Sequence, residues 1–189
     1  GISYGGIQDT NPGGTADQVH ISNSTIVDNQ AVTSCGGFGI SSVSDPGQQS
    51  LRNTIIANNI ANSVSQDVCT ASAINSLGYN LIENNSGASI VNITATNIYG
   101  QDPLLGSLAD NGGPTMTHAL FPGSPAIDKG SSGSATTDQR GETRPVDNPA
   151  IANADGGDGA DIGAYETQPI MFFSSATYSI SENGGTATI

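Results

Sequence analysis

The densest group of residues able to do chemistry is an acidic, glycine-rich loop. It reads Asp155-Gly-Gly-Asp158-Gly-Ala-Asp161, so its three carboxylates stand three residues apart. Calcium takes about 6–8 oxygen ligands in flexible sites, and close carboxylates repel one another unless a cation is present. The loop therefore predicts a calcium site. The alternative is a solvated acidic loop, or carboxylates paired with Arg140 and Arg144.

These two arginines supply half of the four basic residues in the chain. A guanidinium group can bridge carboxylates through paired hydrogen bonds. We therefore expect Arg140 and Arg144 to form a structural network rather than a clamp for a substrate. Its expected acidic partners are Asp128, Asp138 and Asp161.

Residues typical of nucleophilic or acid–base catalysis are few. Residues 1–5, Gly-Ile-Ser-Tyr-Gly, fit the G-x-S-x-G pattern of a nucleophile elbow, which needs a helix after the serine. Turn-forming residues follow instead, so we interpret the match as coincidence. His20 alternates with Val19 and Ile21 and is expected to point outward from a strand, and His118 is interpreted as solvated or hydrogen-bonded. We predict no catalytic residue.

Cys35 and Cys69 are the two cysteines of the chain. An even cysteine count favours a disulfide in an extracellular protein. Neighbouring structural repeats could bring the two together, although two free thiols remain the alternative.

The charge balance excludes several classes of partner. The 189 residues include 4 Lys+Arg against 17 Asp+Glu, a net charge of −13. Nucleic-acid binding through a basic face needs several clustered cations, and anionic lipid surfaces have the same requirement. No apolar stretch approaches the roughly 20 residues of a membrane-spanning helix, and no signal peptide is recognisable. Because patterned sequence begins at once, we expect an internal piece of a longer, processed protein.

The elements that must position these residues are predicted to be strands. Isoleucine outnumbers leucine, and β-branched side chains fit the pleated surface of a sheet. The 25 glycines and 9 prolines argue against long helices. The chain is therefore expected to be all-β.

A five-residue pattern recurs along the first half of the chain. Residues 25–29, 54–58 and 80–84 share the order polar, apolar, apolar, polar, Asn. Repeats of this length predict a β-solenoid, in which the strands of each coil pair with those of the next. Asn29, Asn58 and Asn84 would then occupy equivalent corners. A β-sandwich with short strands is the alternative, but it does not explain the recurrence.

The chain divides into three segments that differ in composition and in strand-like patterns. Residues 1–100 carry the repeats and are expected to be the C-terminal coils of a parallel β-helix. Residues 101–168 lack strand-like runs and contain many prolines and glycines, which predicts an irregular cap over the open edge of the last coil. Residues 169–189 read as a strand, a turn and the beginning of another strand.

Two of these segments resemble a known family. Residues 74–85 resemble the last coils of bacterial right-handed parallel β-helix surface proteins. Residues 101–128, 137–141, 144–145 and 161–166 resemble the choice-of-anchor Q proteins in order and spacing. The resemblance covers roughly residues 50–166 and implies a right-handed parallel β-helix of pectate-lyase-like architecture. It also implies a secreted or cell-surface bacterial protein, and it implies no particular enzymatic activity.

Residues 173–189 are similar to the first strands of a Calx-beta domain, a calcium-binding β-sandwich module of bacterial adhesins. In that family an acidic residue of the first strand binds calcium, and this resemblance implies the same role for Glu182.

Together these features predict a non-catalytic structural or adhesive module of an extracellular, cell-surface or fibre-forming bacterial protein. Its expected partners are further copies of itself, neighbouring surface proteins or glycans. The alternative is a carbohydrate-active enzyme, a polysaccharide lyase or hydrolase, on a β-helix scaffold. That alternative rests on analogy of fold, which does not by itself give function.

Overall fold

The computed structural model describes residues 19–31, 49–68, 73–86, 89–92 and 95–168. These ranges contain β-strands, turns and irregular segments but no helix, as expected of an all-β chain. Accordingly, they hold no helix long and apolar enough to cross a bilayer. The strands are β1 (Val19–Ser22), β2 (Thr25–Val27), β3 (Gln30–Ala31), β4 (Gln49–Arg52), β5 (Ile55–Ala57), β6 (Ile60–Ala61), β7 (Val64–Ser65), β8 (Ile74–Ser76), β9 (Leu81–Ile82), β10 (Ile90–Val91) and β11 (Ile98–Tyr99).

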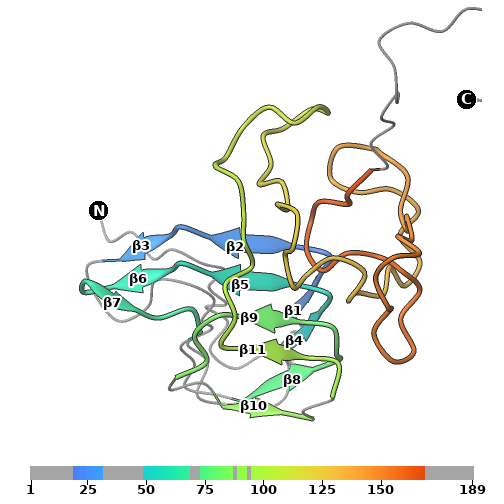
Figure 1. The fold of residues 1–189 in the computed structure, drawn as a ribbon. Coiled ribbons are helices and arrows are strands. Elements are labelled where there is room, and N and C mark those ends of the chain that lie inside the picture. Colours follow the sequence, from blue (N-terminus) through green and yellow to red (C-terminus); the bar gives the residue numbers. More distant parts are fainter. Residues whose placement is uncertain (1–18, 32–48, 69–72, 87–88, 93–94, 169–189) are drawn as a thin grey trace, which may run out of the picture.

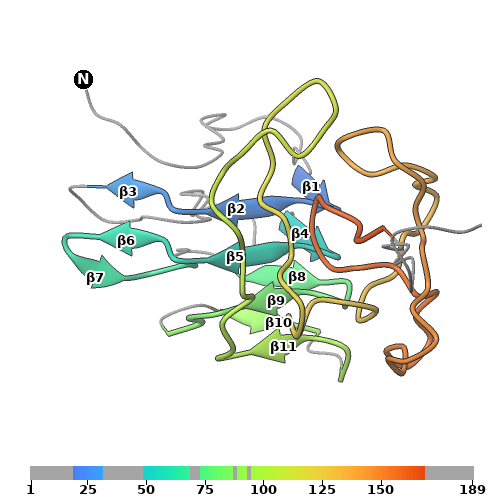
Figure 2. The same ribbon diagram turned by 45° about the horizontal axis from the view of Figure 1, so that its top comes forward.

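The strands form two four-stranded parallel sheets and one smaller sheet (Figure 1). One parallel sheet has the order β1-β4-β8-β10, and the other has the order β2-β5-β9-β11. The third sheet, β3-β6-β7, is parallel between β3 and β6 and antiparallel between β6 and β7. Successive strand pairs therefore occupy successive layers of one stack, which the two views show from different sides (Figures 1 and 2).

Residues with a left-handed backbone turn the chain between the two parallel sheets. Asn23 and Asn53 have φ of 48° and 49°, and Gly78 occupies the equivalent place with φ of 89°. Asn and Gly are the residues that adopt this conformation most readily. A second such corner follows the next strand at Asp28 and Asn58. The repeats are therefore rich in asparagine because their corners need residues that adopt a left-handed backbone.

The register differs in one place from the repeat seen in the sequence. Thr25 pairs with Ile55, so the first two layers are offset by 30 residues rather than 29. Asn29 therefore lies opposite Asn59, whereas Asn58 and Asn84 are equivalent as expected. The expected alignment of Asn29 with Asn58 was wrong, because two adjacent asparagines follow the second strand.

Asparagine side chains connect one layer to the next. The Oδ1 atom of Asn59 accepts hydrogen bonds from the backbone and side-chain N–H groups of Asn29, at 3.1 and 2.9 Å. In the same way, the Oδ1 atom of Asn80 accepts from the backbone of Thr54, and that of Asn97 accepts from the backbone of Asn80, both at 3.1 Å. These bonds satisfy backbone donors at corners that lack a sheet partner.

The interior of the stack is a column of aliphatic side chains between the two parallel sheets. Its most buried members are Ile21, Leu51, Ile56, Val68, Ile74 and Ile82. Side chains alternate between the faces of a strand, so Ile56 enters this column while its neighbours Ile55 and Ala57 face the other way. The two central strands of the β2-β5-β9-β11 sheet, β5 and β9, are consequently buried on both faces.

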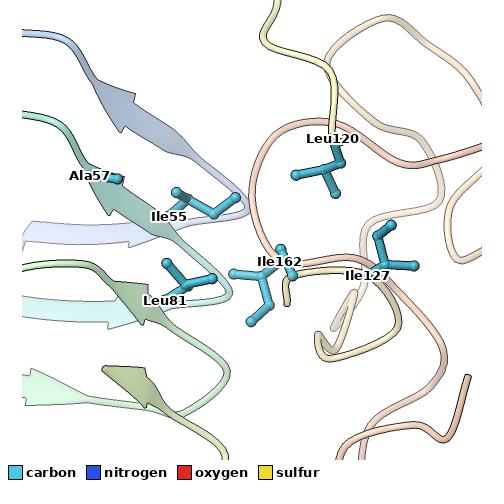
Figure 3. Packing of buried hydrophobic residues seen from close by; sticks show 7 residues of the cluster. Ile55, Ala57, Leu81, Leu120, Ile127 and Ile162 are labelled. Atoms are coloured by element: carbon cyan, nitrogen blue, oxygen red, sulfur yellow. The ribbon is translucent and has the colours of Figure 1, made fainter. Parts of the chain in front are cut away.

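Residues 101–168 pack against that second face. Ile55, Ala57 and Leu81 of the sheet meet Leu120, Ala126, Ile127 and Ile162 of the later segment in one buried cluster (Figure 3). The described residues of this segment contain isolated bridges but no named strand. The contacts of this cluster lie along the side of the stack, because the paired aliphatic pattern of β5 leaves a second apolar face to be covered. The expected cover over the open edge of the last coil stays a prediction.

Candidate functional site

Buried charged residues gather in the second half of the chain, at the junction between the stack and residues 101–168. The Nη2 atom of Arg140 lies 2.7 Å from Oδ2 of Asp138, and Nε donates to the same oxygen at 2.9 Å. The guanidinium group also lies 3.7 Å from the centre of the Tyr165 ring. Burial opposes ionisation of Asp138, but the Glu166 backbone N–H and the Arg140 side chain hold the pKa of Asp138 below its usual range.

A second ion pair joins Arg144 to Glu166, and both side chains are almost wholly buried. The Nε atom lies 2.9 Å from Oε2 without the alignment of a hydrogen bond. The Nη2 atom of Arg144 donates instead to the backbone carbonyl of Asp161 at 2.5 Å. The arrangement neutralises Glu166 within the protein interior.

Glu166 also receives two backbone donors. Its Oε1 atom accepts from Val146 at 2.7 Å and its Oε2 atom accepts from Asp161 at 3.0 Å. Burial, together with the nearby charge of Asp161, nevertheless raises the pKa of Glu166 to about 7. This carboxyl group therefore titrates near neutral pH.

Two further buried carboxylates adjoin this pair. Asp161 accepts from the backbone of Asp128 at 2.9 Å and of Thr167 at 2.6 Å, and burial raises its pKa. Asp128 accepts from the backbone of Asn148 at 3.1 Å, and burial raises its pKa as well. The network expected around the two arginines is present, with Asp138 and Glu166 as its ion-paired acids.

Asn53 connects this segment to the stack. Its side chain donates to Asn23 at 2.8 Å and to the carbonyl of Asp161 at 3.0 Å, and it accepts from the backbone of Ser131 at 3.1 Å. The Asn53 carbonyl also accepts from the backbone of Gly163 at 3.0 Å. One fully buried corner residue thus holds the first two layers and the irregular segment together.

Two close approaches tighten the same contact. A Cβ atom at Gly163 would lie 2.8 Å from both Ile55 Cδ1 and Thr25 Oγ1, and one at Gly130 would overlap Asn53 Oδ1. Arg52 adds a hydrogen bond of 2.8 Å to the Ser131 hydroxyl. The backbone of the segment at Gly130 and Gly163 therefore lies so close to residues of the stack that no side chain fits between them.

The three aspartates predicted to bind calcium have separate surroundings. Asp155 is exposed, and its backbone carbonyl accepts from the Tyr79 hydroxyl at 3.1 Å. Asp158 accepts from the backbone of Ser132 at 3.0 Å, whereas Asp161 is buried in the network described above. The described ranges contain no group of three acidic, histidine or cysteine side chains arranged to hold a metal. Calcium binding here stays a prediction.

Several other predicted features lie outside the described residues. They are Glu182, Cys35, Cys69 and the G-x-S-x-G match at residues 1–5.

The two histidines occupy exposed or partly exposed positions. His20 is exposed on the outer face of β1, as expected, and its Nδ1 atom bonds the hydroxyl of Ser50. The Nδ1 atom of His118 lies 2.8 Å from the carbonyl oxygen of Gly106. His118 also lines a pocket of about 320 Å³ between β2 and the irregular segment, together with Thr25 and Gln139.

Comparison with known proteins identifies no relative. No family model, curated protein or solved structure matches the chain. The site must therefore be interpreted from its own geometry.

The geometry of the junction suits a structural role. Its guanidinium groups and most of its carboxylate oxygens already bind protein groups, and few of these atoms face solvent. Sequence reasoning found both arginines but missed Glu166 as the partner of Arg144, and it missed Asn53. The available signal was the abundance of Asn at predicted corners, which does not reveal which asparagine meets a distant segment.

Proposed function

We propose that this chain is part of a right-handed parallel β-helix that serves as a non-catalytic structural or adhesive module. The proposed setting is an extracellular or cell-surface bacterial protein, as the resemblance to choice-of-anchor Q proteins implies. The layered order of both parallel sheets supports the helical winding. Fibre-forming contacts with further copies, with neighbouring surface proteins or with glycans fit such a module.

The observation that carries this proposal is the internal use of the buried charges. In the Arg140–Asp138 and Arg144–Glu166 pairs, the side chains are at most 6% exposed. A substrate could reach these groups only if the segment left the sheet, and this would leave buried charges uncompensated. Charges arranged in this way stabilise a fixed shape rather than bind and release a ligand.

The alternative is a carbohydrate-active enzyme that uses the pocket beside β2. Of its described lining side chains, His118 is the one that carries an imidazole ring, and the others include Thr25, Asn29 and Gln139. Lyases and hydrolases need a positioned base or a pair of carboxylates. Among the described residues that line this pocket there is no carboxylate. The structural module is therefore the better supported of the two.

Incubation with acidic and neutral polysaccharides separates the two functions. We expect neither unsaturated products nor new reducing ends above those of a heat-denatured control. A His118→Ala variant serves as the second control, because it removes the imidazole ring from the pocket. Reproducible cleavage by the wild type that is lost in His118→Ala would overturn the proposal.

A further inference from the structure

Arg52, the last residue of β4, is the basic residue whose charge no carboxylate of the described residues balances. Arg140 and Arg144 form the two ion pairs of the junction, and Lys129 lies near Asp128, whose ionised form its charge favours. The chain has 17 acidic residues for 4 basic ones, so carboxylates are not scarce. The position of Arg52 in the fold therefore leaves its charge unmatched.

The guanidinium group of Arg52 is held in place but only partly bonded. The residue is half-buried, its Nη2 atom donates to the Ser131 hydroxyl at 2.8 Å, and the group lies 5.8 Å from the centre of the Tyr79 ring. Its Nε atom is buried and bonds no protein group. A buried N–H group without an acceptor and a half-buried charge without a counter-charge both cost free energy. A bound anion would supply the missing counter-charge.

One side of this guanidinium group is open to solvent. The Nη1 atom bonds no described residue and, unlike Nε, is not buried. The exposed backbone of Gly133 passes beside it, and a Cβ atom there would lie 3.4 Å from Nη1. Because Gly133 has no side chain, a ligand can reach Nη1. This atom and the remaining N–H of Nη2 form the pair of parallel donors that matches the two oxygens of a carboxylate.

Bonds within the protein fix the groups around Arg52. The backbone N–H of Ser131 donates to Asn53 Oδ1 at 3.1 Å. The Tyr79 hydroxyl donates to the carbonyl of Asp155, and the Tyr79 backbone N–H donates to the Thr96 hydroxyl, both at 3.1 Å. A ligand therefore meets groups that are already in place, which lowers the entropic cost of binding.

The loops beside this group favour a sugar over a peptide as the ligand. Residues 131–134 read Ser-Ser-Gly-Ser, and residues 155–157 read Asp-Gly-Gly. Their hydroxyl and backbone groups suit sugar hydroxyls, and they contain no apolar side chain to anchor a peptide. The Tyr79 ring adds an aromatic surface of the kind found in small-molecule sites. A net charge of −13 opposes a polyanion, so the fitting ligand carries one isolated carboxylate.

We propose that Arg52, the Ser131 hydroxyl and the Tyr79 ring form a binding site for one acidic sugar residue, such as a uronic acid, carried by an otherwise neutral glycan. The guanidinium group binds the sugar carboxylate, and the serine- and glycine-rich loops bind the sugar hydroxyls. This inference rests on the proposed structural or adhesive function and names the ligand class of the module.

The test is an NMR titration of the protein with glucuronate, with glucose as the neutral control. We expect glucuronate, but not glucose, to shift the amide signals of Tyr79 and of residues 131–133 in a saturable way. Arg52→Gln should weaken the binding of glucuronate at least about tenfold, because it removes the charged donors.

A second pair of variants leaves Arg52 and its bonds in place. Gly133→Ala sets a methyl group 3.4 Å from Nη1 and should weaken the binding of glucuronate severalfold. Gly123→Ala is the matched control, because Gly123 also has a positive φ, 88° against 65° at Gly133, and nothing lies within 4 Å of the added atom. It should bind glucuronate as the wild type does.

Acetate and tetraglutamate distinguish the source of the carboxylate. Acetate lacks the sugar ring and should bind more weakly than glucuronate, and a tetraglutamate peptide should bind more weakly as well. Equal binding of acetate, tighter binding of the peptide, no saturable shift with glucuronate, or undiminished binding by Arg52→Gln would overturn the proposed site. None of these results would indicate glycan cleavage, which is the outcome that overturns the proposed function itself.

Discussion

The Asn53 side chain donates a hydrogen bond of 3.0 Å to the backbone carbonyl of Asp161, across 108 residues of sequence. The same amide group bonds Asn23 in the layer before, and both Asn53 and Asp161 are fully buried. A corner residue of the repeats is thereby also the anchor of the irregular segment. Stability of the stack and attachment of the segment should therefore change together.

Replacing Asn53 by alanine should destabilise the protein strongly. The variant loses the hydrogen bonds to Asn23, Asp161 and Ser131, and it keeps a left-handed backbone that alanine adopts poorly. Asn58→Ala is the matched control, because Asn58 has φ of 56° but an exposed side chain. In urea unfolding we expect Asn53→Ala to cost about 2–4 kcal/mol more than Asn58→Ala. Equal losses would show that the backbone strain alone matters.

Removal of the Arg140 side chain should expose the energetic role of the buried network. Arg140→Ala leaves the Asp138 carboxylate without its cation and removes the contact with the Tyr165 ring. Breaking a buried pair from one side typically costs about 3–5 kcal/mol. Lys129→Ala, which removes a cation outside both ion pairs, should change the free energy of unfolding by less than about 1 kcal/mol. An unchanged melting curve for Arg140→Ala would contradict the network.

Gly163 tests the close approach of the segment to the sheet. Its φ is 103°, and an added methyl group would meet Ile55 and Thr25 at 2.8 Å. Gly112 has φ of 91° and nothing within 4 Å of the same position. Both alanine variants pay for an unfavourable backbone, about 1 kcal/mol, but only Gly163→Ala must also displace neighbours. Thermal denaturation should show a clearly larger loss for Gly163→Ala, and similar losses would rule out tight docking.

The raised pKa of Glu166 makes stability depend on pH. Its folded-state pKa of about 7 exceeds the ordinary value of 4.5, so the folded protein binds the proton more tightly than the unfolded chain does. The contribution of this group is therefore complete below pH 4.5 and is lost as the pH rises through 7. The loss amounts to about 3 kcal/mol at most.

Glu166→Gln should remove this dependence. The free energy of unfolding, measured with urea at intervals from pH 4.5 to 7.5, should fall less steeply with pH in the variant than in the wild type. Asp128 and Asp161 shift in the same direction and remain in both proteins, so the difference between the curves reports Glu166. Parallel curves would mean that Glu166 titrates normally.

The all-β character and the parallel, repeating layers could be predicted from the sequence. Short aliphatic pairs at regular spacing, followed by asparagine, indicate both. The exact register could not be predicted, because Asn58 and Asn59 are adjacent and the sequence does not tell which of them bonds to Asn29 in the previous layer. In the structure it is Asn59. The burial of the second face of β5 could not be predicted either, since an Ile-Ile pair does not tell which residue faces the interior and which faces another segment.

The charged network was predictable in kind but not in partners. With four basic residues in the chain, two nearby arginines had to find carboxylates. Asp138 lies two residues from Arg140 and was expected, whereas Glu166 reaches Arg144 through the folded path of the whole segment. Such long-range pairs depend on packing that local sequence does not encode.

Hydrogen exchange across the junction tests most directly whether the stack and residues 101–168 form one rigid structural unit. We expect the amides of β5 and of residues 161–166 to exchange with the same opening free energy, and to lose protection together in Gly163→Ala. Early exchange of residues 161–166 with unchanged protection of β5 in the variant would contradict a single unit.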